Sequence, residues 1–381
     1  MHQIFERDDS DTPINIGFFL EKNTTDFILY DLIDYQKLYF RDVYILTLEE
    51  GDGELALFCR ANGIKWYGVK GKKFISRIIA VVYLCRREKI KALYINGYAL
   101  SKFIFPLKII APKLHLVSIR HHNKVHHILG AKRAILIDKL AGKYSNSIIA
   151  VSNSAKETIL KEGTAERKIA VIYNGVNSKR FLTFRNPYLE RMEKHKWKLV
   201  ALGRIVWEKN YQEMIQVMSD LAKRNVNFEL NIYGNGPSIE IEKLKSQIQD
   251  LDLGDKVFVR GFTYDAPRTL MDSDILIHTA VDESLGMVII EGYLAGIPIV
   301  SNTPAGVREI ATVLGDKLAE KNLDLTDKLL LVIKEYDSFI LTARTLQLRA
   351  QTIFDIREMG ERYRKHFEST RNYLKELNRR Y

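Results

Sequence analysis

The sequence predicts an α/β protein with two doubly wound domains, each built on a parallel sheet. Short runs of apolar and β-branched residues alternate with longer amphipathic segments along all 381 residues. Near-continuous apolar strands separated by helices are typical of parallel sheets that are covered on both faces. Two such series occur in the chain, and its length also fits two domains better than one.

The first series of apolar runs predicts seven strands and the second predicts five. Helical patterns lie between most of them, for example Tyr211–Arg224 and Ile239–Gln249. The expected strands are Ile14–Phe19, Val43–Thr47, Lys65–Val69, Leu93–Asn96, Leu114–Ile119, Ile148–Val151, Ile169–Tyr173, Leu199–Gly203, Phe228–Tyr233, Val257–Arg260, Ile275–His278 and Pro298–Ser301. Ligands of such sheets bind at the carboxyl ends of the strands, so functional residues are expected there.

The domain boundary is expected between Asn174 and Lys198. A turn signal, Asn174-Gly175-Val176-Asn177, is followed by a polar and charged stretch that continues through Trp197. We therefore expect a first domain over residues 1–185 and a second over 186–355. The remaining segment, 356–381, is expected to be a helix, and packing back on the first domain is one arrangement open to it.

Basic residues are concentrated in the first half of the chain. The net charge is +11, but residues 1–185 hold 30 Lys and Arg against 18 Asp and Glu, whereas 186–381 hold 28 against 29. Between Lys65 and Lys143, 18 basic residues accompany only Glu88 and Asp138. A solubilising surface is the simpler explanation, but charge this concentrated indicates an anionic partner: a phospholipid surface, a phosphorylated lipid or nucleic acid.

Several features predict a cytoplasmic protein. The N-terminus lacks the basic start and apolar stretch of a secretory signal, and Cys59 and Cys85 are too few for a disulfide framework. No apolar run approaches the ~20 residues of a membrane helix. The helix candidate Leu100–Ile110, with Lys102 and Lys108 among apolar residues, suggests peripheral attachment to the inner face of the cell membrane. A buried helix that covers the sheet explains the same pattern equally well.

The strongest functional signal is the segment Asp282–Glu291, which reads DESLGMVIIE. It follows a predicted strand and opens a predicted helix that ends near Gly296. A helix N-terminus presents free N–H groups to a phosphate, and Gly286 lets a ligand approach the backbone closely. The alternative is that Ser284 is an ordinary N-cap residue.

The two carboxylates of this segment suit a nucleotide sugar. Glu283 can accept hydrogen bonds from sugar hydroxyls. Glu291 lies beside the apolar run Met287–Ile290 and needs donors, which a ribose diol supplies. A solvated helix residue is the alternative for Glu291.

A second signal follows the predicted strand that ends at Gly203. Arg204 and Lys209 lie in the loop before a helix that begins near Asn210, and their cations can converge on a diphosphate. Ordinary surface charges in a loop are the alternative.

Weaker signals follow the neighbouring strands. Tyr233–Pro237 is a glycine turn, Val259–Phe262 can offer backbone groups to a base, and Thr303–Glu309 can close over the same site. Each is weak alone, but consecutive strand ends that all carry such features favour a site for a nucleoside diphosphate sugar.

In this combination the second half resembles the donor domain of the retaining family 4 glycosyltransferases, or glycosyl transferases group 1, which adopt the GT-B fold. The resemblance is dense over residues 198–310. The E-x7-E motif of the family is matched by Glu283 and Glu291. Its other motifs are matched by Gly203, Arg204 and Lys209, by Gly234, Gly236 and Pro237, and by Gly306 and Glu309.

The resemblance implies retaining transfer from a UDP- or GDP-sugar to a lipid-linked or polysaccharide acceptor in cell-surface glycan synthesis, with no cofactor and no required metal. Arg204 and Lys209 would hold the pyrophosphate, Glu283 would orient the sugar, and Glu291 would bind the ribose. The implied donor-binding set is Gly203, Gly234, Gly236, Arg260, Ser284, Leu285, Gly286, Met287 and Glu291.

The first half resembles the acceptor domain of the family more loosely. His121 stands where the family commonly has a histidine near the transferred sugar, and His122 is the next candidate. With His126 and His127 they invite a metal hypothesis, because His122 and His126 have ligand spacing on a helix. No nearby acid completes that set and Asp138 looks isolated. A cationic, histidine-rich entrance for an anionic acceptor therefore fits the charge pattern better.

Two other functions remain open at this point. A nucleotide-sugar epimerase on a similar fold would need a general base and carboxylates facing the sugar from the first half, which the sequence does not reveal. A non-enzymatic protein that binds nucleic acid or another anion would use the basic region. The sequence shows no aromatic-interleaved basic motif, so we expect no nucleic-acid partner.

Overall fold

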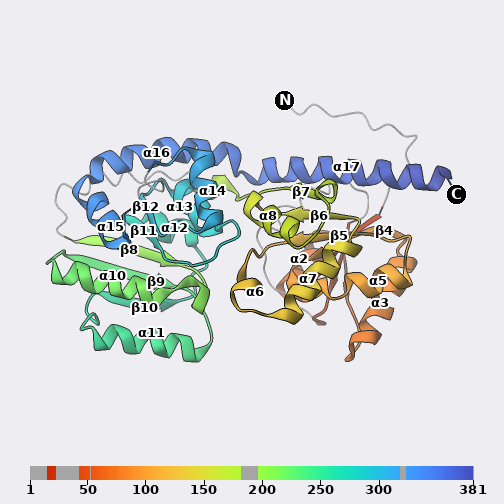
Figure 1. Ribbon diagram of the computed structural model, residues 1–381, viewed down its shortest axis with the longest axis horizontal. Helices are drawn as coiled ribbons and strands as arrows, with labels where there is room; N and C mark the ends of the chain where they lie inside the picture. Colours follow the sequence, from red (N-terminus) through yellow and green to blue (C-terminus); the bar gives the residue numbers. More distant parts are fainter. Residues whose placement is uncertain (1–14, 23–42, 52, 182–195, 318–322, 381) are drawn as a thin grey trace.

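The computed structural model describes residues 15–22, 43–51, 53–181, 196–317 and 323–380. These residues form two parallel sheets that lie side by side along the molecule (Figure 1). The first has the strand order β3-β2-β1-β4-β5-β6-β7 and the second β10-β9-β8-β11-β12. In both sheets the first strand of the series lies inside and later strands extend to either side, which is the doubly wound arrangement. The predicted fold class is confirmed.

All twelve predicted strands are present, within a few residues of their expected ends. In the first sheet they are β1 (Asn15–Leu20), β2 (Val43–Thr47), β3 (Lys65–Gly68), β4 (Ile90–Asn96), β5 (His115–Arg120), β6 (Ser147–Ala150) and β7 (Ile169–Val171). In the second they are β8 (Trp197–Leu202), β9 (Phe228–Tyr233), β10 (Val257–Gly261), β11 (Ile275–His278) and β12 (Ile299–Ser301). Central strands such as β2 and β11 are buried along their whole length, as strands covered on both faces must be.

Helices cover both faces of each sheet. Those of the first half are α2 (Glu54–Ala61), α3 (Phe74–Arg87), α4 (Tyr98–Ser101), α5 (Ile104–Ile110), α6 (Val125–Ile128), α7 (Lys132–Tyr144), α8 (Asn153–Lys161) and the 3-10 turns η1 (Glu166–Lys168) and η2 (Ser178–Phe181). Those of the second half are η3 (Trp207–Lys209), α10 (Tyr211–Lys223), α11 (Ser238–Asp250), α12 (Ala266–Met271), α13 (Met287–Ala295), α14 (Ala305–Leu314), α15 (Leu325–Lys334), α16 (Tyr336–Ile353) and α17 (Ile356–Arg380).

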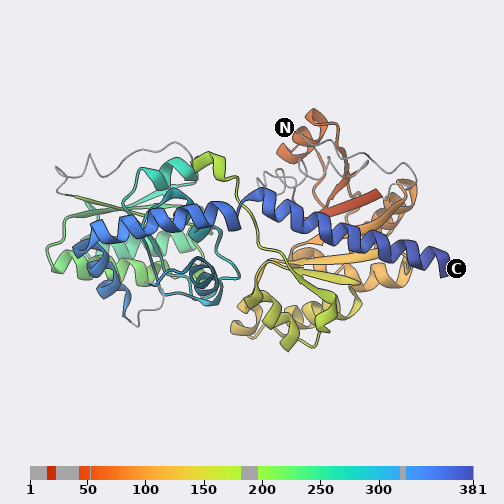
Figure 2. The same cartoon turned by 90° about the horizontal axis from the view of Figure 1, so that it is seen from above.

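The last helix returns to the first sheet. Figure 2 shows α16 over the second half and α17 continuing across the first. Met359, Tyr363 and Phe367 of α17 join the core that contains Phe18 and Tyr94 of β1 and β4. The long helical run therefore ties the two halves together.

Among the described residues, the chain passes between the halves near Val176 and again near Phe354, and these two segments touch. Val176 donates its N–H to Phe354 O (2.8 Å) and accepts from Ile356 N (3.0 Å). A Cβ on Gly175 would lie 2.7 Å from the Cα of Ile356, so only glycine fits there.

The segment Leu100–Ile110 is not one helix but two, α4 and α5. Phe103, Ile104 and Leu107 are fully buried against the first sheet, which supports the sheet-covering alternative for these three residues. No helix in the described ranges has both the length and the hydrophobicity of a transmembrane span.

Candidate active site

The N-terminus of α13 forms one wall of the site. Gly286 is its N-cap, with φ of 90°, a conformation that favours glycine. Ser284 is therefore not the cap; its Oγ instead donates to His121 O, 2.5 Å away on the first half. Gly306 packs directly on the loop before the helix, where an added Cβ would lie 2.5 Å from Glu283 O.

Lys209, Glu283 and His278 come together at the carboxyl end of β11. Lys209 forms an ion pair with Glu283 Oε2, and His278 Nε2 lies 3.3 Å from the same oxygen. Burial raises the pKa of Glu283, but hydrogen bonding from His278 and the charge of Lys209 outweigh it and lower this pKa to about 2. Glu283 is thus held as a carboxylate, which suits an acceptor of sugar hydroxyl hydrogen bonds.

His278 is a site residue that the sequence reasoning missed. It is 4% exposed, its Nδ1 lies 3.3 Å from Ser301 Oγ, and burial lowers its pKa. A single histidine at the end of an apolar strand looks like a core residue. The available signal was its place five residues before Glu283, at a strand end of the predicted site.

The loop that carries Lys209 is fixed by backbone contacts. Thr279 Oγ1 donates to Lys209 O (2.9 Å), and Val281 N–H donates to Glu208 O (2.9 Å). Arg204 is largely exposed and pairs with Glu208 at 3.3 Å. Lys209 is thus positioned in the site, whereas the Arg204 side chain lies at its solvent edge.

Three of the predicted glycines pack two loops against each other. A Cβ on Gly234 would lie 1.8 Å from Gly203 O, and one on Gly236 would lie 2.0 Å from Ile205 O. Gly203 N–H also donates to Tyr233 O at 3.0 Å. Any side chain at Gly234 or Gly236 would push the Arg204 loop away from the second sheet.

Glu291 lies on α13 and is only partly accessible. Burial raises its pKa to about 7, opposed by the charge of Arg180. This corrects the alternative of a solvated helix residue. A half-ionised carboxylate in such a place is ready for a ligand that offers hydroxyl donors.

The other donor-set residues have different surroundings. Leu285 is 2% exposed and belongs to the core beneath α13, and Met287 is the first residue of that helix. The guanidinium of Arg260 lies over Phe258 (4.4 Å) and donates to Asn231 (2.6 Å), so its side chain is held against β9 and β10.

His121 and His122 have different surroundings on the first half. His121 is exposed, its Nε2 lies 2.5 Å from Asn96 Oδ1, and its carbonyl faces the donor side through Ser284. Nearby, Lys124 N–H donates to Asp282 Oδ2 at 3.0 Å. The loop after β5 therefore touches the segments on both sides of Glu283.

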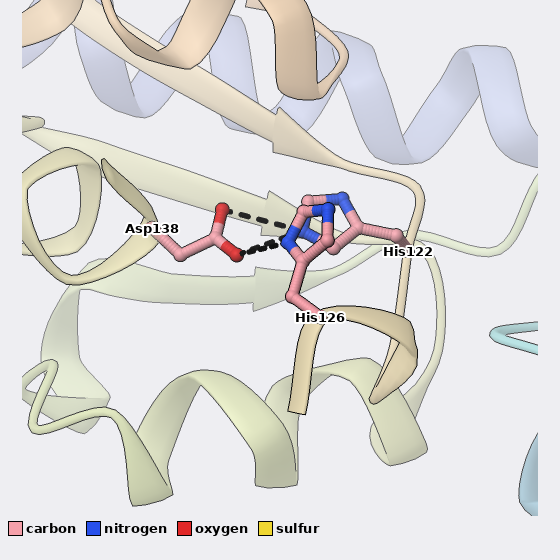
Figure 3. A group of neighbouring side chains, drawn as sticks. All are labelled: His122, His126 and Asp138. Atoms are coloured by element: carbon pink, nitrogen blue, oxygen red, sulfur yellow. Dashed lines mark hydrogen bonds and ion pairs between the residues drawn. The ribbon is translucent and has the colours of Figure 1, made fainter. Parts of the chain in front are cut away.

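His122 points instead into a cluster with His126 and Asp138 (Figure 3). Asp138 Oδ2 lies 3.1 Å from His122 Nε2 and 2.8 Å from His126 Nδ1. Arg120 reaches the same oxygen at 3.3 Å and donates to both oxygens of Glu162 at 2.9 Å. The expectation that Asp138 is isolated and that no acid lies near these histidines was wrong.

This cluster has the donor set of a metal site, since its ligand atoms lie within 4.8 Å of one another. A guanidinium already neutralises the shared carboxylate oxygen, however. Asp138 is 2% exposed and its pKa is lowered: burial raises it, but hydrogen bonding from His122 and the charge of Arg120 dominate. We interpret the cluster as a closed hydrogen-bond network that holds the loop after β5.

Glu309 joins the two halves at a second place. Its carboxylate accepts from Asn153 N (2.7 Å), Ser154 N (2.9 Å) and Tyr173 Oη (2.8 Å). The first two lie at the N-terminus of α8, where a negative charge is favoured. In this structure Glu309 contacts the first half and does not close over the donor site.

The comparisons with known proteins agree with this fold. The model of "Glycosyltransferase Family 4" matches residues 42–180, and that of "Glycosyl transferases group 1" matches residues 189–338. Together with the two facing doubly wound sheets, these matches show that the chain belongs to the family 4 glycosyltransferases of the GT-B fold.

Individual relatives are distant. The gpi3 subunit of phosphatidylinositol N-acetylglucosaminyltransferase from Schizosaccharomyces pombe is 24% identical over 59% of this chain and 49% of its own length. An Escherichia coli UDP-Gal:alpha-D-GlcNAc-diphosphoundecaprenol alpha-1,3-galactosyltransferase is 23% identical over 54% and 52%. The matched segments thus span about half the length of these relatives. The crystal structure of HepE from Anabaena with UDP-glucose superposes with a TM-score of 0.78 at 18% identity, covering 93% of this chain and 100% of that one.

Proposed function

We propose that this chain is an active glycosyltransferase that takes its sugar from a UDP- or GDP-sugar, with retention of configuration at the transferred carbon. The observation that carries the proposal is the Lys209–Glu283 pair beside the N-terminus of α13. It combines a cation for the leaving diphosphate with a carboxylate for the sugar. The uridine diphosphate glucose in HepE supports a uridine donor.

The roles of the side chains follow from their chemistry. Lys209 and the exposed side chain of Arg204 stabilise the charge that grows on the diphosphate as its bond to the sugar breaks. Glu283 orients the sugar through its hydroxyls, Glu291 binds the ribose, and His121 faces the transferred sugar from the other side. These cations take the role that a metal has in other transferases, so we propose that transfer needs none.

A matched pair of variants tests the donor site. Glu283→Gln keeps the shape of the side chain but removes its charge, and we expect it to slow transfer by about a hundredfold or more. Glu242→Gln, on the exposed surface of α11, should leave transfer unchanged. Wild-type transfer by Glu283→Gln would refute the assignment. Thermal shift with UDP and GDP, in the presence of EDTA, identifies the base and tests metal independence.

We further propose that the first half binds the acceptor and that the acceptor is a lipid-linked glycan or a growing polysaccharide at an anionic membrane on the cytoplasmic side. The basic first half supports this, as does the diphosphoundecaprenol-linked acceptor named for the E. coli relative. Incubating the protein with labelled donor and bacterial membrane lipid should carry label into the organic phase. Label found only in water-soluble oligosaccharide would contradict the lipid-linked acceptor.

A further inference from the structure

Helix α3 presents an apolar stripe to solvent. Ile75, Ile79 and Tyr83 are 70%, 60% and 60% exposed. Their spacing of four residues places them along one side of the helix. The other side packs into the core of the first sheet through residues such as Ile78 and Val81. Three large exposed side chains in register form a patch, unlike the single apolar residues that scatter over any surface.

Helix α5 lies next to α3 (Figure 1). Ile109 and Ile110 at its end are 61% and 47% exposed, and Phe74 at the start of α3 is 41% exposed. We call this surface the α3–α5 face; its apolar members are Phe74, Ile75, Ile79, Tyr83, Ile109 and Ile110.

The segment that carries the α3–α5 face is strongly basic. Residues 70–113 contain eleven Lys and Arg but a single acid, Glu88. That carboxylate is already bonded to Arg87 (2.7 Å) and Tyr67 (2.9 Å). Lys72 and Lys73 lie exposed at one end of α3. The field of this face therefore favours an anionic partner.

A pocket of about 430 Å³ opens at the far end of α3, between that helix, the start of β4 and the turn after α5. Its composition is amphiphilic. Val82, Cys85, Ile90 and Leu114 are buried and form an apolar floor, while Arg86, Lys89, Lys91 and Lys113 are exposed around it, and none of its described lining residues is acidic.

We propose that the α3–α5 face docks on an anionic lipid bilayer and that this pocket receives the phosphate head group and first carbons of an acidic phospholipid. Apolar side chains that enter the interface and cations that meet lipid phosphates are the two parts of such binding. A nucleic acid would use the cations but would gain little from a stripe of Ile and Tyr.

The direction of α3 connects this face to the sheet edge that carries His121, and this step rests on the proposed function. Strand β3 ends at Gly68 and α3 starts at Phe74, so the beginning of α3 lies at the carboxyl edge of the first sheet. His121 follows β5 at the same edge. A bilayer along α3 would therefore meet the same edge of the sheet as His121, where a lipid-linked acceptor would arrive.

Vesicle flotation of the full chain tests the proposal. We expect binding to vesicles of phosphatidylglycerol and phosphatidylcholine, and little binding to pure phosphatidylcholine. Ile75→Ser with Ile79→Ser should weaken binding at least tenfold. Both side chains are exposed, so the fold should not change. Arg86→Gln with Lys113→Gln should remove most of the preference for the acidic lipid.

Matched control variants distinguish vesicle binding through this face from nonspecific hydrophobic or electrostatic binding. Leu341→Ser with Leu348→Ser removes two side chains that are 63% and 64% exposed on α16. Lys245→Gln with Lys334→Gln removes two exposed cations from the second half. Both control variants should bind vesicles like the wild type, and all variants should keep the thermal shift with nucleoside diphosphate.

Three results would overturn the proposal: no flotation with acidic vesicles at low salt, equal losses in the control variants, or binding to RNA or DNA that the same α3 substitutions abolish while vesicles stay unbound. If the proposed donor site is wrong, the experiments give a different result. In that case vesicle binding remains, but the nucleoside diphosphate shift and sugar transfer are absent.

Discussion

At the scale of single residues, the two glutamates of the E-x7-E motif have pKa values that are shifted in opposite directions. Lys209 and His278 keep Glu283 ionised with a pKa of about 2, whereas burial raises the pKa of Glu291 to about 7. Both conditions suit a polyhydroxyl ligand. Glu283 is a hydrogen-bond acceptor at any ordinary pH. Glu291 becomes fully ionised, and so a full acceptor, when hydroxyl donors of a ribose replace the water that burial has removed from it.

Nucleotide binding should therefore depend on pH through Glu291. A ribose bound to Glu291 as proposed would favour the carboxylate, so the pKa of Glu291 would fall on binding and a proton would be released. Affinity should be highest above pH 7 and should fall by up to tenfold per unit as pH drops below 7. The diphosphate itself titrates near pH ~6, so calorimetry from pH 5.5 to 8 should compare wild type with Glu291→Gln. Identical pH profiles in the two proteins would rule out this role.

At the scale of elements, the loop after β5 depends on the cluster around Asp138. Asp138→Asn keeps the shape but leaves Arg120 and two imidazoles without their shared carboxylate. Because this group is buried, we expect a loss of about 3–5 kcal/mol in the free energy of unfolding, measured with urea. Glu166→Gln is the control, since its ion pair with Lys156 is exposed and should contribute little to stability. A loss below about 1 kcal/mol for Asp138→Asn would contradict the network.

The glycine turn offers a second test at this scale. A Cβ on Gly236 would lie 2.0 Å from the carbonyl oxygen of Ile205, against backbone that cannot rotate away. Gly236→Ala should therefore move the Arg204 loop and weaken nucleotide binding. Gly254→Ala, where nothing lies within 4 Å of the added Cβ, is the control. The readout is the nucleoside diphosphate thermal shift, and an unchanged shift in Gly236→Ala would show that the close packing is dispensable.

The sequence predicted those elements whose pattern is local. Twelve apolar runs became the twelve strands because a buried parallel strand is apolar at every position. Leu100–Ile110 was harder, since an apolar stretch does not reveal that the helix breaks near Phe103. His278 and the partners of Asp138 were missed for another reason. Their roles depend on residues that the fold brings together from distant parts of the chain.

At the scale of the whole molecule, the two halves are joined by contacts of different kinds. The long α16–α17 run and the Val176 crossing form a permanent connection. Loops of the two halves also form hydrogen bonds to each other among the described residues, through Glu309, Asp282 and Ser284. Separating the halves at these loops breaks those hydrogen bonds, while the α17 connection stays intact.

The α17 connection itself should be sensitive to acid. His115 on β5 packs against Tyr373, and both of its ring nitrogens are buried without a hydrogen-bond partner among the described residues. On α17, His366 Nδ1 lies 3.1 Å from Tyr94 Oη. Burial lowers the pKa of each histidine to about 4. Both are therefore neutral in the fold but take up protons when unfolded, so stability is lost as pH falls from about 6.5 toward 4.

The expected loss of stability in acid is large enough to measure. At pH 5 each histidine should cost on the order of 2 kcal/mol relative to pH 7.5. His115→Leu removes one of the two groups, so its free energy of unfolding should fall less steeply with pH than that of the wild type. At pH 7.5 it should equal or exceed the wild type, because two unsatisfied buried nitrogens are removed. Urea denaturation at the two pH values gives both numbers, and parallel losses in the two proteins would show that protonation of His115 does not limit the attachment of α17.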